Sequence, residues 1–210
     1  MNNFFIDTHC HLQDKVYDAV AIREIVNLSA AANVRILIVS GYDEESNRIA
    51  IELSLKYPEI YATVGFHPEY KEKLSEMQIT VLMEQLNMPK TVGVGEIGLD
   101  YHYPEIDKSI QRDNFISQLQ IANKVKKPVI IHTRDSINET YEILKEYKDK
   151  DLKGIVHCYS SSVEMAKKFI KVNMLLGIGG VVTYKNSEVL KDVVKSINME
   201  NLVLETDSPY

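Results

Sequence analysis

The sequence contains only two cysteines, Cys10 and Cys158, and no CxxC pair. Two cysteines in a chain of 210 residues do not build a disulfide framework. Each cysteine stands next to a histidine. Because a free cysteine most often behaves as a small buried apolar side chain, we favour that interpretation for both.

The chain also lacks an excess of positive charge and a long apolar run. Its net charge of -6 argues against a protein that coats long nucleic acid by charge alone, though not against an enzyme that binds a short backbone segment through metal ions. The most apolar stretch, residues 172–182, includes three glycines and is too short to cross a bilayer. Residues 1–12 have no basic start and no apolar core, so we expect no signal peptide, no membrane association and a cytoplasmic location.

The remaining composition is that of an ordinary globular protein, with 45% hydrophobic and 26% charged residues. No linker and no low-complexity tract divides the chain. We therefore expect residues 1–210 to form a single domain.

Short apolar, β-branched runs alternate with segments whose apolar residues have helical spacing. The expected strands are residues 4–7, 34–40, 60–65, 91–95, 128–132, 154–157, 174–178 and 202–205. These runs are apolar on both faces, which is typical of buried parallel strands. Eight alternating units favour an α/β fold of the (β/α)8 TIM-barrel type over an open sheet.

Serine-led motifs mark three expected helix starts. Ser75 with Gln78, Ser136 with Glu139, and Ser161 with Glu164 each fit a capping box, in which two side chains satisfy each other's free backbone amides.

Potential metal ligands gather at one point of this pattern, the carboxyl ends of the expected strands. They are His9, His11, Glu96, His132, His157 and Asp207. In a closed parallel barrel these ends share one face, so residues far apart in the sequence should meet there. His9 and His11 are two positions apart on an extended segment, so their rings should point the same way.

Each of these residues alone has a simpler structural explanation. His132 and His157 could be hydrogen-bonded core histidines, Glu96 a buried ion-pair partner, and Asp207 a helix N-cap. The combination of four histidines and two carboxylates at one barrel face instead favours two divalent ions, with nitrogen and oxygen donors that suit Zn, Mn, Co or Mg.

Six segments also resemble the TatD-type metal-dependent deoxyribonucleases, a family of amidohydrolase-like barrels. The resemblance extends over the whole chain and rests on DTHCHL at 7–12, GFHP at 65–68, GVGEIGLDY at 93–101, PVIIHTRD at 128–135, HCYS at 157–160 and LETDSPY at 204–210. Together these motifs are highly specific. The family has Phe more often than Tyr159, and Ser-Gly more often than Ser160-Ser161, a departure that affects loop shape rather than the ligands.

This resemblance implies a role for each site residue. His9, His11 and Asp207 would bind one metal ion, His132 and His157 the other, and Glu96 would lie between them. His67 and Arg134 would contact phosphate. For Arg134 the physics agrees, because a guanidinium matches two phosphate oxygens, although a salt bridge at the strand mouth explains it about equally well. His67 could instead be a core histidine.

The function that follows is a phosphodiesterase, expected to be a deoxyribonuclease that shortens DNA ends or short nucleic acid from the 3′ end. A water activated by two metals would attack phosphorus, with Asp207 as the candidate to take or orient its proton and Glu96 as the bridging carboxylate.

Two alternatives remain open. The first is a hydrolase of an amide, lactone or phosphotriester on the same barrel, which commonly has a carbamylated Lys where this chain has Glu96. The second is a truncated, inactive protein that binds nucleic acid or a protein partner. The sequence has no helix after the eighth expected strand, so we expect its outer face and that of residues 4–6 to be exposed, with possible self-association there.

Overall fold

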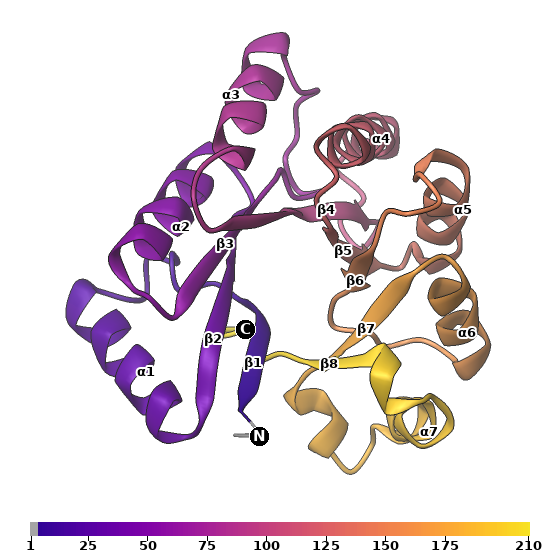
Figure 1. Ribbon diagram of the computed structural model, residues 1–210. Coiled ribbons are helices and arrows are strands. Elements are labelled where there is room, and N and C mark those ends of the chain that lie inside the picture. Colours follow the sequence, from indigo (N-terminus) through magenta and orange to yellow (C-terminus); the bar gives the residue numbers. More distant parts are fainter. Residues whose placement is uncertain (1–3) are drawn as a thin grey trace.

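The computed structural model describes residues 4–210; residues 1–3 of the expected domain and N-terminal stretch lie outside the described part. Strands and helices alternate along the chain, as Figure 1 shows in a view into the ring of strands. The elements are β1 (Phe5–Cys10), α1 (Ala19–Ala31), β2 (Val34–Ser40), α2 (Glu44–Lys56), β3 (Ile60–Val64), α3 (Glu76–Leu86), β4 (Thr91–Asp100), α4 (Lys108–Val125), β5 (Val129–Arg134), α5 (Ile137–Tyr147), β6 (Gly154–Val156), α6 (Val163–Lys171), β7 (Met174–Ile178), η1 (Gly180–Thr183), α7 (Glu188–Ser196), η2 (Met199–Asn201) and β8 (Leu202–Leu204).

The eight strands form one sheet in the order β1 to β8, and each consecutive pair is parallel. The sheet curls into a nearly closed barrel with the helices around it (Figure 1). The expected (β/α)8 architecture is therefore confirmed. In the described residues, no helix is both long enough and apolar enough to span a membrane.

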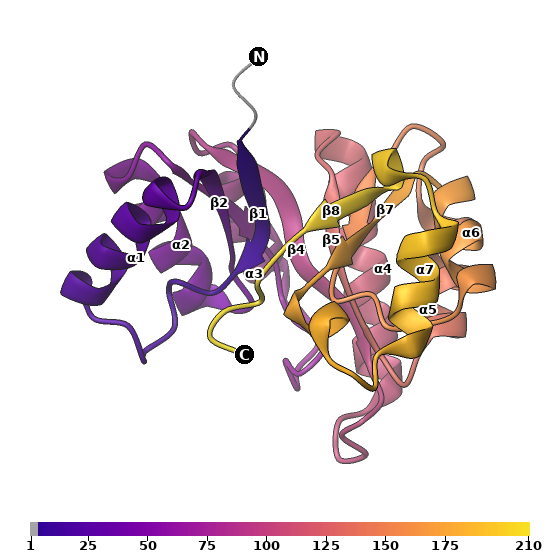
Figure 2. The same ribbon diagram turned by 90° about the horizontal axis from the view of Figure 1, so that it is seen from below.

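Polar contacts close the seam between the first and last strands, which lie side by side in Figure 2. The Thr8 hydroxyl donates to the carbonyl of Leu204 at 3.0 Å. The carboxylate of Asp7 accepts from the Thr206 amide at 3.0 Å and from its hydroxyl at 2.6 Å. These bonds position the carboxyl end of β8 against β1, which is the end where the candidate ligands lie.

Three strands extend beyond their expected ends. β1 continues to Cys10 rather than ending at residue 7, β4 to Asp100 rather than to residue 95, and β5 to Arg134 rather than to residue 132. Parallel pairing of β4 with β5 persists as far as Asp100 and Arg134. The apolar runs underestimated these strands because their last residues include polar side chains, although Glu96 and Asp100 of β4 are buried.

Two of the three expected capping boxes are wrong. Ser75 and Gln78 form one at the start of α3. Ser136 precedes α5 but makes no capping bond, because its hydroxyl donates to the carbonyl of Leu99 at 2.8 Å. Ser162 rather than Ser161 caps α6, accepting from the Met165 amide at 3.3 Å.

The surface also answers two expectations. Cys10 is buried as expected, but the expectation of burial is wrong for Cys158, which is exposed in a turn directly after β6 with a left-handed backbone conformation, φ 46°. Phe5 on β1 and Leu204 on β8 are 54% and 52% exposed, as expected for outer strand faces that no helix of the described residues covers.

Candidate metal centre

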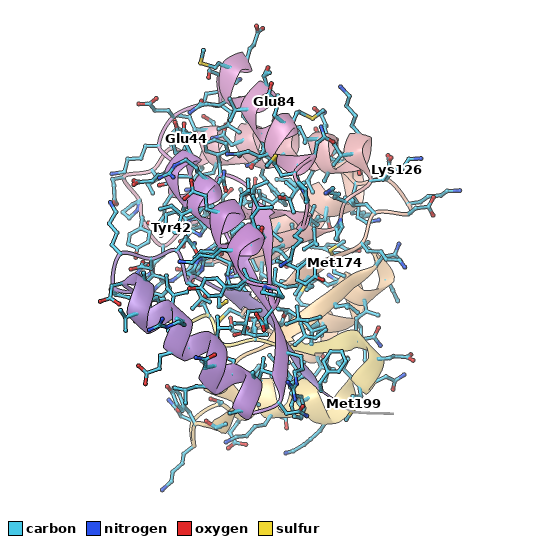
Figure 3. All side chains as sticks on the ribbon, turned by 60° about the vertical axis from the view of Figure 1, so that its left-hand side comes forward. Tyr42, Glu44, Glu84, Lys126, Met174 and Met199 are labelled. Carbon is cyan, nitrogen blue, oxygen red and sulfur yellow. The ribbon has the colours of Figure 1, made fainter. Side chains whose placement is uncertain are left out.

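The six expected ligands come together at the carboxyl end of the barrel, from five different strands and the loops that follow them. All of them except the fully buried His9 line a pocket of about 640 Å³. Tyr42 belongs to this pocket, and Figure 3 shows it at the opposite end of the molecule from Lys126, which ends α4. A cup at the carboxyl ends of the strands is where enzymes with this fold build their sites.

Glu96 is the centre of the cluster and is almost completely buried. One of its oxygens, Oε1, lies 2.9 Å from His132 Nδ1 and 2.9 Å from His157 Nε2. The other, Oε2, lies 3.3 Å from His9 Nε2 and 3.6 Å from His11 Nε2. One carboxylate oxygen thus faces each of the two ligand groups that the family resemblance implies.

The second carboxylate, Asp207, completes the group around His9 and His11. Its Oδ1 lies 3.5 Å from His9 Nε2 and 3.4 Å from His11 Nε2. The two histidine nitrogens are themselves 3.0 Å apart, so both rings do point into the same space. These contacts bring together three donor atoms from opposite ends of the chain.

The donor set fits a divalent cation. His11 Nδ1 lies 2.9 Å from the carbonyl oxygen of Ser40, which accepts from Gln13 Nε2 at 2.6 Å and can also accept a hydrogen carried by Nδ1. With the hydrogen on Nδ1 of the neutral ring, Nε2 presents a lone pair toward His9, Glu96 and Asp207. Nitrogen and oxygen donors converge without a thiolate, because Cys10 Sγ turns to the carbonyl of Ile38.

The electrostatics of the cluster favour positive charge. Burial by itself raises the pKa of Glu96, but the neighbouring histidines, His157 first, outweigh it and hold that pKa well below the ordinary value. Burial lowers the pKa of His157, but Glu96 and Glu205 outweigh it and hold the pKa well above the ordinary value. The ionised carboxylate therefore requires a cation beside it, whether a proton on histidine or a metal ion.

Residues that sequence reasoning missed contact the outer nitrogens of the four histidines. Ser40 contacts two of them, His9 Nδ1 through its hydroxyl at 3.1 Å and His11 Nδ1 through its carbonyl. Asp100 Oδ2 lies 2.9 Å from His132 Nε2. Glu205 Oε1 lies 3.6 Å from His157 Nδ1. Asp100 and Glu205 both lie within motifs quoted above. An acidic residue at the end of an expected strand was the feature of the sequence that could have indicated them.

The two expected phosphate contacts lie in different surroundings. His67, in the loop after β3, has its Nε2 3.6 Å from Glu96 Oε1, and its ring centroid is 4.4 Å from that of His132. With those two residues it forms a third group whose geometry could hold an ion. Arg134 ends β5 at the pocket rim with its guanidinium carbon 5.8 Å from the Tyr103 ring centroid. No ion pair involves Arg134 in the described residues, which removes the salt-bridge explanation there.

The fold and the site together define the class of this protein. It is a parallel eight-stranded barrel with a candidate metal centre of histidines and carboxylates at the carboxyl ends of its strands. Residues 6–210 match the family described as TatD related DNase. The chain belongs to this family.

Relatives and solved structures agree with this assignment. The uncharacterized metal-dependent hydrolase YabD of Bacillus subtilis is 37% identical over 204 residues, which are 97% of this chain and 80% of YabD. The crystal structure of YjjV, a TatD homolog from Escherichia coli, has a TM-score of 0.88 and 32% identity, and the match covers 98% of this chain and 79% of that one. The hydrolase TatD family protein from Entamoeba histolytica has a TM-score of 0.88 and 27% identity over 100% of this chain and 75% of that one.

Proposed function

We propose that this protein is a metal-dependent phosphodiesterase that removes nucleotides from the 3′ end of DNA. The observation that carries the proposal is the position of Glu96, which turns one oxygen toward His9 and His11 and the other toward His132 and His157. A carboxylate shared in this way suits two neighbouring cations. The family description, TatD related DNase, supports a nucleic acid substrate.

The proposed ligands of one ion are His9, His11 and Asp207, those of the other are His132 and His157, which both contact Glu96 Oε1, and Glu96 serves both ions. Divalent cations bound there would lower the pKa of a water molecule and offset the charge that develops on a phosphodiester. Metal binding would also displace protons from His132 and His157, whose pKa values stay above the ordinary value because neighbouring carboxylates outweigh the effect of burial.

Arg134 is the proposed phosphate contact. Its guanidinium is at the mouth of the pocket and, within the part of the chain that the structure describes, has no acidic partner. It can therefore bind two phosphate oxygens without first breaking an ion pair. A pocket of about 640 Å³ is large enough for one nucleotide at a chain end.

Asp207 is the proposed proton acceptor. Its side chain is 24% exposed, in contrast to 4% for Glu96, so it reaches the open part of the pocket where water and substrate enter. Burial raises the pKa of Asp207, but the contact with His11 and the charge of His157 outweigh it and keep the carboxylate ionised. An ionised carboxylate at the pocket can orient an attacking water and accept its proton.

The test combines metal analysis with digestion. The purified chain is stripped with a chelator, loaded with Mg, Mn or Zn in turn, and given single-stranded oligonucleotides labelled at the 5′ or the 3′ end. We expect about two ions per chain and stepwise loss from the 3′ end that the chelator stops, with Glu96→Gln as the inactive control. Intact DNA together with opening of a lactone or a dihydropyrimidine would favour the amidohydrolase alternative, and zero bound metal would favour the inactive one.

A further inference from the structure

Glu205 is a buried carboxylate that the proposed reaction does not use. It follows β8, and its side chain is 0% exposed. Its Oε1 accepts a hydrogen bond from the Cys158 amide at 2.5 Å, while Oε2 has no hydrogen-bond partner in the described residues. Because burial of a carboxylate with so few partners is unfavourable, its presence calls for an explanation.

The fold provides a dedicated space for this side chain. A Cβ atom on Gly177 of β7 would lie 2.2 Å from Glu205 Oε2 and 2.6 Å from its Cδ. Only a residue without a side chain at position 177 leaves room for the carboxylate between the strands. The space between the strands therefore requires glycine at position 177, and the Glu205 carboxylate fills that space.

The partner that the carboxylate faces is His157. Its Nδ1 lies 3.6 Å from Glu205 Oε1 and is, like Glu205 Oε2, one of the few buried polar atoms in the described residues without a hydrogen-bond partner. The other nitrogen, Nε2, lies 2.9 Å from Glu96 Oε1 in the centre of the site. Stacking on His9, with centroids 4.0 Å apart and planes at 19°, fixes the face of the His157 ring.

We propose that Glu205 is a positioning residue for His157, an inference that rests on the proposed metal-dependent function. Glu205 Oε1 faces Nδ1 across 3.6 Å, a charge contact rather than a hydrogen bond, and a carboxylate there favours a hydrogen on Nδ1. It thereby favours the tautomer in which Nε2 presents its lone pair to the centre. A carboxylate behind a metal-binding histidine also increases the basicity of the ring. Asp100, 2.9 Å from His132 Nε2, occupies the corresponding position behind the neighbouring histidine.

Three variants separate the parts of this argument. Glu205→Ala removes the acceptor, Glu205→Gln keeps the shape and an oxygen that can still accept, and Gly177→Ala displaces an intact carboxylate. Glu200→Gln is the matched control, because Glu200 is exposed and lies only five positions away. Binding of Mn and Zn is measured by titration calorimetry, and the visible spectrum of the Co-loaded protein reports the ligand geometry.

We expect Glu205→Ala and Gly177→Ala to weaken one of two bound ions by roughly 10–100-fold and to leave the other unchanged, since loss of such a partner typically costs that much affinity. Glu205→Gln should recover part of the affinity, and its Co spectrum should resemble the wild type more closely than that of Glu205→Ala. A purely structural role would lower thermal stability in all three without altering the spectrum. Glu200→Gln should match the wild type in every measurement.

The experiment distinguishes failure of the proposed function from failure of this inference. A wild-type chain that binds no metal overturns the proposed function and this inference with it. A wild-type chain that binds metal, alongside Glu205→Gln and Glu205→Ala proteins with unchanged affinity and spectrum, overturns only the inference. Glu205→Gln preserves side-chain volume, so it keeps the test decisive if the other two variants do not fold.

Discussion

The backbone amide of Asp207 donates a hydrogen bond to the carbonyl oxygen of His9 at 2.9 Å. The two residues come from the last and first strand regions, and both side chains face the same cluster. In the next contact along the seam the donor is on the other segment: the His11 amide donates to the Ser208 carbonyl at 2.8 Å. The same backbone contacts that close the barrel thus also assemble the candidate metal centre.

The first prediction concerns the two carboxylate oxygens of Glu96. Glu96→Ala should weaken both bound ions, because each oxygen faces a different histidine group, whereas His11→Ala should weaken mainly the ion near Asp207. His9 is a less selective probe, because it contacts His11 and Asp207 and also lies against Glu96 and His157. Elemental analysis and calorimetric titration measure the two affinities. Equal losses in Glu96→Ala and His11→Ala would contradict the bridging role.

The second prediction concerns Arg134. Arg134→Ala should raise the KM for an oligonucleotide roughly 10-fold or more, since a hydrogen bond to a charged group contributes about 1.5–3 kcal/mol. Arg134→Lys should have an effect of intermediate size, because lysine keeps the charge but not the paired donors. Initial rates over a range of substrate concentrations separate KM from kcat. If lysine and alanine prove equivalent, Arg134 does not bind phosphate through its paired donors.

The third prediction concerns the seam. The buried Asp7 carboxylate accepts three hydrogen bonds, two from Thr206 and one from the His9 amide at 3.2 Å. Asp7→Ala leaves these donors unpaired and should lower the free energy of unfolding by on the order of 2–3 kcal/mol. Thr206→Val removes one donor only and should cost about 1 kcal/mol.

Urea unfolding followed by circular dichroism measures both changes. Because the same seam positions Asp207, metal affinity should fall in Asp7→Ala as well. Stability that is unaffected by either substitution would mean that the apolar core alone closes the barrel.

The fourth prediction concerns pH. Burial and the hydrogen bond to Glu139, at 2.8 Å, raise the pKa of Tyr101 well above the ordinary value. Below about pH 10, the ordinary pKa of tyrosine, Tyr101 is protonated in both the folded and the unfolded chain, so its full contribution to stability is present. At higher pH the unfolded chain ionises while folded Tyr101 keeps its proton, so stability is lost as the pH rises toward the folded pKa.

Between pH 9 and 11 the free energy of unfolding of the wild type should therefore fall by up to about 1 kcal/mol relative to that of Tyr101→Phe. This value is discounted because solvent screens the partly exposed side chain. Chemical denaturation of both proteins at the two pH values gives this double difference. A difference that stays constant with pH would rule out the raised pKa.

The sequence alone determined the barrel and the meeting of its candidate ligands. Eight apolar runs that alternate with helical segments predict parallel strands, and the carboxyl ends of parallel barrel strands share one face. The sequence pattern is therefore enough to predict that His9 and Asp207 lie close together. This prediction needs only the period of the pattern and the position of each residue in it.

Only the tertiary structure decided which residues orient the ligands. Ser40, Asp100 and Glu205 contact the outer nitrogens of the histidines through distances that depend on strand register. The extension of β4 to Asp100 and the space beside Gly177 depend on neighbouring strands in the same way. A sequence pattern reports which face a residue occupies, but a contact between side chains on different strands is set by register, twist and packing, which are properties of the assembled barrel.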